Sequence, residues 1–306
     1  MGLPVTISDI AKKTRISPIT QPTGEKRIQG KQEKQQIIGC LAADITEGSV
    51  SQIIRGIEQI LGKNGGSLFM VSGVEFGQDL KKAYGFLKSH ALDGILLCHH
   101  MPFWQDFAND LKNTDVPLVS IGMEVPEAIS VLSDNKDGGY LAADHLYTCG
   151  MRHPAMLCGP KDRFSVQERL KGFKRRVREL GLAFDEADLF FGPYDFEHGY
   201  ISAKELLDTH PLTDGIFCAN DYIAAGVITR LQRMHIEVPR QVQVLGFDNR
   251  DFAAFWATPI STLELPLEKM GRTAMELLQN SIDTGTYVLE KQVLPPSLIP
   301  RASTRG

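Results

Sequence analysis

Two short apolar segments of this chain end abruptly in polar side chains that are able to bind a small polar molecule. Residues 217–221 have the sequence FCAND and residues 244–249 the sequence VLGFDN, so that Asn220 and Asp221 follow one apolar run and Asp248 and Asn249 follow the other. Such a run is typical of a strand buried on both faces of a parallel sheet. Ligands bind at the carboxyl ends of these strands. The pattern predicts a polar cleft, although Asn and Asp also commonly cap helices or form turns.

The elements that must position these residues alternate between strand-like and helix-like segments from residue 37 onward. This alternation implies βαβ units and parallel sheets, with right-handed crossovers placing helices on both sheet faces. The expected strands are 37–43, 68–71, 94–98, 117–121, 129–132, 155–158, 189–191, 215–218 and 242–247. The expected helices are 50–61, 80–89, 104–111, 139–149, 166–180, 198–208, 222–234 and 267–282, and residues 291–301 are expected to be extended.

A chain of 306 residues exceeds one typical hydrophobic core, so two lobes are expected. The strand–helix pattern restarts near residues 149–150, which predicts the first crossing between the lobes there. The predicted fold is α/β, with two doubly wound parallel-sheet lobes and a short helical head. The expected parts are a head and linker at 1–36, a first lobe at about 37–149 plus 265–283, and a second lobe at about 150–262 plus 284–306.

Charge is distributed unevenly along the chain. The net charge is −4, which argues against a protein that coats nucleic acid with its whole surface. Residues 1–36 hold seven Lys and Arg against three Asp and Glu, so the head carries +4 and the remainder −8. A basic head on an acidic body indicates nucleic-acid contact, and the other interpretation is a solvated, disordered tail.

Cysteine content and hydropathy indicate the compartment. The five cysteines form an odd set without a CxxC pair, and four of them lie in apolar runs, as small buried hydrophobes of a reducing compartment do. No apolar run approaches the roughly 18 residues that a membrane helix needs. The N-terminus has no hydrophobic signal segment. We therefore expect a cytoplasmic protein without membrane contact.

Several motifs, in their order and spacing, resemble the LacI/GalR family of bacterial transcription regulators. They are VTISDIA at 5–11, DGIL at 93–96, VPLV at 116–119, SDN at 133–135, HL…GMRH at 145–153, RLKGF at 169–173, ANDYIAAG at 219–226, GFD at 246–248 and PISTL at 259–263. The resemblance spans residues 37–300 nearly continuously. It implies a core of the type I periplasmic-binding-protein kind, in which a small metabolite biases lobe closure and so alters DNA affinity.

The resemblance also implies effector contacts at particular positions. The matching positions are Arg169, Asn220, Asp248 and Phe196, with Asp137, Arg163 and Ser165 matching contacts that only some relatives use. The rigid fork of an arginine at 169 suits bidentate binding of hydroxyls, and the alternative is a salt bridge on its own helix. A carboxylate at 248 suits vicinal hydroxyls. Phe196 matches an aromatic residue that stacks on the ligand, and the other interpretation is that it is an ordinary residue of the hydrophobic core.

Other positions bear on the class of effector. Leu265 stands where some sugar-responsive relatives have a polar contact, and Ser49 and Val50 stand where the nucleobase-sensing branch has aromatics. A sugar or sugar derivative is therefore favoured over a purine. No cofactor is implied, and a homodimer through the core is the expected assembly.

The head departs from the family pattern. Its first helix, with Ser8 as N-cap, is intact through residue 18, and Thr6, Ser8 and Lys12 could contact phosphates, which carry little sequence information. Only 18 residues, 19–36, then precede the first core strand, without a recognition-helix pattern or a Leu-Ala-rich hinge helix. Two functions stay open: a ligand-responsive regulator that binds operator DNA, and a sensor or dimerisation module without specific DNA binding.

Enzymatic and secreted classes have little support. The sequence has no G-x-S-x-G, Walker A, H-E-x-x-H or strand-linked G-x-G-x-x-G motif. His99 and His100 follow the third strand and could ligate a metal, but adjacent residues of extended chain point to opposite sides. A secreted binding protein would need the signal segment that the N-terminus lacks.

Overall fold

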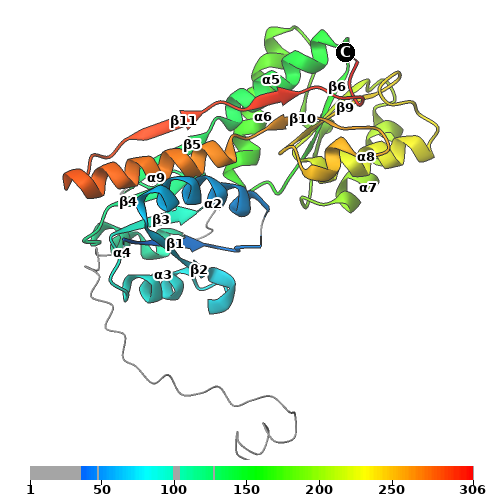
Figure 1. Ribbon diagram of the computed structural model, residues 1–306. Coiled ribbons are helices and arrows are strands. Elements are labelled where there is room, and N and C mark those ends of the chain that lie inside the picture. The colour runs from blue at the N-terminus through cyan, green and yellow to red at the C-terminus, as the bar shows by residue number, and fades with distance from the viewer. Residues whose placement is uncertain (1–35, 47, 99–103, 127, 306) are drawn as a thin grey trace, which may run out of the picture. The chain divides into compact units, whose positions relative to one another are not determined.

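Two six-stranded sheets organise the part of the chain that the computed structural model describes, residues 36–46, 48–98, 104–126 and 128–305 (Figure 1). The predicted α/β class with two doubly wound, mainly parallel sheets is confirmed. The predicted helices and strands within these ranges also recur, most with ends shifted by only a few residues. Residues 1–35, and with them the predicted head helix, lie outside the described residues.

The first sheet has the strand order β11-β5-β4-β3-β1-β2, and every neighbouring pair is parallel. Its strands are β1 (Ile37–Ala42), β2 (Ser67–Ser72), β3 (Gly94–Cys98), β4 (Leu118–Ile121), β5 (Ile129–Ser133) and β11 (Lys291–Leu294). The accompanying helices are α2 (Gly48–Leu61), α3 (Leu80–Lys88), α4 (Ala108–Lys112) and α9 (Leu267–Thr284), with 3-10 turns η1 (Gly62–Asn64), η2 (Gly73–Phe76) and η3 (Trp104–Phe107).

The second sheet has the order β12-β10-β9-β8-β6-β7, in which only β12 is antiparallel to its neighbour. Its strands are β6 (Pro154–Cys158), β7 (Leu189–Phe191), β8 (Gly215–Cys218), β9 (Gln243–Phe247), β10 (Ser261–Glu264) and β12 (Ser297–Ile299). Its helices are α5 (Asn135–Thr148), α6 (Phe164–Glu179), α7 (Phe196–Thr209) and α8 (Asp221–Arg233), with 3-10 turns η4 (Glu186–Asp188) and η5 (Asp251–Ala254).

Continuous apolar runs form the central strands because both faces of each sheet are covered. Every residue of β3, β6, β8 and β9 is buried. Polar residues can then occur only where a strand ends and the chain emerges at the sheet edge. The functional residues discussed below lie at those ends.

Three pairs of helices pack so closely that each helix presents a glycine to the backbone of the other. A Cβ added at Gly139 of α5 would collide with the Arg169 carbonyl of α6, and a Cβ at Gly172 of α6 would collide with the Lys136 carbonyl of α5. The same reciprocal arrangement relates Gly199 and Gly226 in the α7–α8 pair, and Gly56 and Gly271 in the α2–α9 pair. Small residues let helix backbones approach closely, so these glycines set the position of α6 and α8 over the second sheet.

The lobe boundaries differ from the expected ones in two places. Helix α5, expected in the first lobe, packs on α6 and contacts β8 and β9 of the second sheet, so the chain crosses at about residues 133–135. Strand β11, expected in the second lobe, pairs with β5 at the edge of the first sheet (Figure 1). The sequence pattern therefore predicted the crossing one helix too late. Helix α5 belongs with the second sheet because the close contact between Gly139 and Gly172 packs it against α6.

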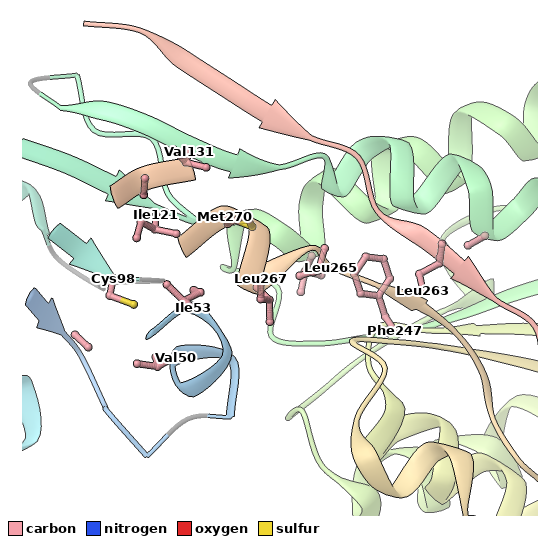
Figure 2. Close-up of a cluster of buried hydrophobic side chains, with 14 of the residues drawn as sticks. Val50, Ile53, Cys98, Ile121, Val131, Phe247, Leu263, Leu265, Leu267 and Met270 are labelled. Atoms are coloured by element: carbon pink, nitrogen blue, oxygen red, sulfur yellow. The ribbon is translucent and has the colours of Figure 1, made fainter. Parts of the chain in front are cut away.

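Apolar side chains connect the two sheets where the chain crosses from β10 to α9. Leu265 and Leu267 lie between Phe247 of β9 and Met270 of α9, as Figure 2 shows. All four belong to one cluster of buried side chains that draws on both sheets. Among the described residues, no helix has the length and apolar character needed to cross a membrane.

Candidate functional site

A cavity of about 800 Å³ lies at the carboxyl ends of strands from both sheets. The first sheet contributes lining residues at or after the ends of β1, β3, β4 and β5, and the second contributes those after β6, β7, β8, β9 and β10. The polar and charged lining residues are Thr46, Ser49, Gln52, Gln105, Glu124, Ser133, Asn135, Asp162, Arg163, Ser165, Arg169, Asn220, Asp248 and Arg250. Phe164, Tyr194, Tyr222, Leu265, Leu267, Met123 and Met270 supply the aromatic and apolar surface.

Asp248 reaches the cavity because the chain turns sharply after β9. Asp248 and Asn249 have φ angles of 98° and 50°, in the left-handed region that Asp and Asn occupy more readily than other non-glycine residues. The Asp248 amide donates to the Leu263 carbonyl at 2.7 Å. The Asn249 side chain donates to Glu264 at 2.8 Å and accepts from Arg301 at 2.6 Å. These bonds maintain a backbone conformation that would otherwise be unfavourable, as often occurs at functional sites.

Arg169 of α6 is held by partners from three different segments. Its Nε donates to Asn135 at 2.9 Å, and its Nη1 donates to the Ala219 carbonyl at the end of β8. Its Nη2 lies 3.6 Å from Oδ1 of Asp248, and its guanidinium stacks 3.5 Å from the centroid of the Phe247 ring. The side chain is only 6% exposed. Arg169 thus joins the ends of β8 and β9 to the start of α5.

The Asp248 carboxyl is poorly solvated and flanked by cations. Burial raises its pKa, while Arg169 and Arg250 oppose that rise. Its side chain retains 19% exposure, on the side that faces the cavity. A carboxylate with partly free oxygens in such a place is suited to accept hydrogen bonds from ligand hydroxyls.

Asn220 has a structural role as well as a position in the cavity lining. It is the N-cap of α8, and its Oδ1 accepts from the Ile223 amide at 2.9 Å, as the capping interpretation of the sequence allowed. Its Nδ2 donates to the Tyr194 carbonyl at 3.3 Å. One donor hydrogen of this amide therefore remains for a ligand.

Asp221 lies beneath the cavity rather than in its lining, and it is fully buried. Its two oxygens accept from the Thr262 hydroxyl at 2.6 Å and from the Arg250 backbone amide at 2.7 Å. Burial raises the pKa of Asp221 to about 7, and the nearby Asp248 adds to the rise, although both hydrogen bonds lower it. This carboxyl therefore supports the β9–η5 turn from below.

An aromatic residue does line the cavity, but it is Tyr194 and not Phe196. Asp195 caps α7 by accepting from the His198 amide at 2.8 Å, so the helix begins at Phe196, earlier than expected. The Phe196 ring then stacks with Tyr200 one turn further on, at 6.1 Å, and lies away from the cavity lining. Tyr194, before the cap, packs against Gly159 and faces the cavity.

The structure brings together five of the seven expected effector contacts. Arg169, Asn220, Asp248, Arg163 and Ser165 all line the cavity, whereas Phe196 and Asp137 do not. Asp137 lies in a separate cavity of about 310 Å³ between α5 and α6, together with Asp134, Lys136, Tyr140 and Arg175. The expected DNA contacts Thr6, Ser8 and Lys12, and the candidate metal ligands His99 and His100, lie outside the described residues.

Several lining residues were not predicted from the sequence, and three of them contribute to the site chemistry discussed below. Asn135, Tyr194 and Arg250 line the cavity and directly follow, or come within a few residues of, the ends of β5, β7 and β9. The rule that strand ends carry ligand contacts, applied to every expected strand, would have pointed to them. Within the described part of the chain, no group of three or more His, Cys, Asp or Glu side chains could hold a metal ion.

Comparisons with known proteins agree with this architecture. The pattern of periplasmic binding protein-like domains matches residues 143–304. The HTH-type transcriptional repressor PurR of Vibrio atlanticus (strain LGP32) is 26% identical over 322 residues, which cover 98% of this chain and 94% of that protein.

Two solved structures of regulators with bound sugars are also similar. The complex of the transcriptional regulator CelR with cellobiose superposes with a TM-score of 0.75 at 27% identity, over 88% of this chain and 85% of that one. A LacI family transcriptional regulator from Enterococcus faecium with bound ribose superposes with a TM-score of 0.72 at 26% identity, over 88% of this chain and 98% of that one. These relatives are regulators and not enzymes.

Proposed function

The chain belongs to the family of periplasmic binding protein-like domains and, as its motifs predict, to the LacI/GalR transcription regulators, and from this we propose that it is a repressor whose core senses a sugar or sugar derivative. The effector would occupy the cavity at the strand ends. The chain would act in the cytoplasm, where its five unpaired cysteines remain reduced.

The observation that carries this proposal is the buried Arg169–Asp248 pair in the lining of an 800 Å³ cavity. Asp248 offers a carboxylate acceptor and Asn220 a spare amide donor, which together suit hydroxyl groups. Tyr194 and Phe164 offer aromatic faces on which a sugar ring can pack. The two related regulators with bound sugars, cellobiose in one and ribose in the other, support the same class of effector.

Both sheets contribute to the lining, so an effector would bias the relation between the two lobes. Ser49 and Gln52 come from α2 beside the first sheet, and Asp248 and Asn220 from the second. A ligand that contacts both sides stabilises the arrangement in which both sets of contacts form. Lobe closure is then the two-state element through which effector binding alters DNA affinity.

A melting-temperature titration with neutral sugars, sugar derivatives and nucleobases tests the effector class. A ligand that binds only the folded state raises the melting temperature by mass action. We expect a sugar or sugar derivative to do so, and Asp248→Asn to abolish the shift. Asp251→Asn, an exposed carboxylate three residues further on, is the matched control and keeps it. A shift with nucleobases alone would contradict the sugar assignment.

A second candidate function follows from the short head. Only 18 residues, 19–36, separate the first helix expected from the head sequence from β1, without a recognition-helix pattern. That observation favours a sensor or dimerisation module that has lost specific DNA binding. Titration of duplex DNA at several salt concentrations discriminates between the two functions. Nanomolar, sequence-dependent binding supports the repressor, whereas weak binding that is independent of sequence and vanishes near physiological salt supports the module.

We also propose that the chain forms a homodimer, and an exposed aromatic group on the second lobe supports this. Phe255, next to Trp256 in the sequence, is 88% exposed. The Trp256 ring contacts those of Phe196 and Phe252, and Phe252 contacts Tyr222. Large exposed apolar patches mark interaction sites. Sedimentation velocity should find a dimer that Phe255→Asp weakens. A protein that is monomeric at micromolar concentration would contradict the assembly.

A further inference from the structure

Arg250 is a cation in the cavity that the sugar proposal does not use. It follows Asp248 by two residues, and its side chain is 26% exposed. Its backbone amide, and not its side chain, donates to Asp221. The role of the guanidinium in this site is therefore separate from the role of its backbone in supporting the β9–η5 turn.

The hydrogen-bonding capacity of this guanidinium is not met by its surroundings. The Nη2 atom lies 3.9 Å from Oδ2 of Asp248, beyond hydrogen-bond distance. The Nε atom is buried and has no acceptor among the described residues. A buried charged donor without an acceptor is costly, so a residue in this condition at a cavity wall is suited to a ligand acceptor.

Apart from Arg163, a partly exposed lining arginine at the N-cap of α6, the other charged side chains around the cavity are paired or exposed. Arg169 is bound to Asn135, to the Ala219 carbonyl and to the Phe247 face, and it compensates the Asp248 carboxylate. Glu124 forms an ion pair with Lys291 at 2.7 Å, and Asp162 is exposed. Arg250 is then a cation in excess of what the buried carboxylate requires.

Arg250 also reaches across the cavity to the other lobe. Its Nη1 atom lies against Gly48 at the first turn of α2, where a Cβ would collide with it. The guanidinium is thereby held between the β9 end of the second sheet and the α2 side of the first. A ligand acceptor bound to this guanidinium would therefore lie in the part of the cavity where the two lobes meet.

We propose that the effector carries an anionic group, a phosphate or a carboxylate, which Arg250 binds. This inference rests on the proposed function, because it assigns a charge to the effector of the same cavity. A guanidinium presents a planar fork of donors that matches both anions in a bidentate manner. The sugar hydroxyls would be bound at Asp248 and Asn220, and the anion would be bound at Arg250.

Matched sets of ligands test the proposal in the intact chain. Each set contains a neutral hexose, its 6-phosphate and its uronate, for example glucose, glucose 6-phosphate and glucuronate, with binding measured by calorimetry. We expect one anionic member to bind about tenfold to a hundredfold more tightly than its neutral parent, as loss of a charge-assisted hydrogen bond would imply. The member that gains affinity distinguishes the phosphate from the carboxylate.

Variants assign the preference to the side chain. Arg250→Gln should lower the ratio of anion affinity to neutral-parent affinity to about one, while the bond from its backbone amide to Asp221 is retained. Arg250→Lys keeps the charge and should keep part of the preference. Arg178→Gln, an exposed arginine on α6, makes the same change in net charge away from the cavity and should have no effect.

Each possible result supports or overturns a specific part of the proposal. Neutral sugars that bind as tightly as their anions, or an Arg250→Gln variant that weakens both equally, would overturn the anionic effector while leaving a sugar sensor in place. A preference that survives in Arg250→Gln would overturn the assignment to this residue. No binding by any member of the sets would overturn the sugar sensor itself and the anionic effector with it.

Discussion

The Nη2 atom of Arg169 lies 3.6 Å from Oδ1 of Asp248, which links the first turns of α6 to the carboxyl end of β9. This pair is the centre of the cavity wall on the second sheet. The arginine is fully engaged with protein partners, whereas the carboxylate is partly free. Asp248 is therefore the member of the pair that we propose for ligand contact, and Arg169 holds Asp248 and its neighbours in position.

Replacement of Arg169 should destabilise the fold as well as the site. Arg169→Ala removes the donors for Asn135 and the Ala219 carbonyl and leaves Asp248 without its closest buried cation. Breaking a buried ion pair from one side costs about 3–5 kcal/mol, so urea unfolding should show a loss of that order. Arg175→Ala, on the exposed face of the same helix, is the control and should cost less than about 1 kcal/mol. Equal losses would mean that Arg169 has no special structural role.

The aromatic contact with the effector should map to Tyr194. With an effector found by melting temperature, Tyr194→Ala should weaken its binding by about tenfold, since an aromatic contact in a site contributes about 1 kcal/mol beyond its buried area. Phe196→Ala should leave the affinity unchanged, because its ring stacks on Tyr200 outside the cavity lining. Calorimetric titration of both variants measures this. The opposite ranking would restore Phe196 as the stacking residue.

Two glycine substitutions in helices should have effects of opposite sign. Gly172→Ala places a Cβ against the Lys136 carbonyl, so α5 and α6 must separate, and the free energy of unfolding should fall by about 2 kcal/mol or more. Gly85→Ala in α3 meets no atom within 4 Å and should stabilise the chain by about 0.5–1 kcal/mol. Chemical denaturation of both variants measures the pair. Destabilisation by Gly85→Ala would contradict the open environment of that residue.

Asp221 should make stability depend on pH in the acid range. Its pKa is raised from 3.8 to about 7 on folding, so the folded state binds a proton that the unfolded state has released. The contribution to stability is therefore fully present below about pH 4 and is lost as pH rises toward 7, at up to about 1.4 kcal/mol per pH unit. Asp221→Asn should lack this component.

Urea unfolding of the parent chain and of Asp221→Asn at pH 5 and pH 7.5 measures the component as the difference between the two chains. The parent should lose more stability than the variant on going to the higher pH. The Asp248 carboxyl, whose pKa is also raised, titrates in both chains, and its interaction with Asp221 is part of the measured difference. Identical pH profiles would show that Asp221 is ionised throughout.

Local sequence patterns alone determined most of the secondary structure of this protein and part of its candidate site. Apolar runs predicted the buried strands, and helical spacing predicted most of the helices, because each pattern reflects burial within a single segment. Polar residues directly after the runs predicted Asn220 and Asp248 in one cavity, because parallel strands bring their carboxyl ends to the same edge, whereas Asp221 and Asn249 from the same segments are not part of its lining. The family motifs added Arg169, which also lines that cavity.

Only the tertiary structure decided the features that depend on two distant segments or on the first residue of a helix. Asp195 starts α7 at Phe196, which turns this ring away from the cavity and leaves Tyr194 in its place. Strand β11 joins the first sheet by pairing with β5, more than 150 residues earlier in the chain. The Arg250 guanidinium lies in the cavity because Gly48 of the other lobe leaves room for it. A periodic pattern records which face of a segment is buried, but it does not record which other segment covers that face.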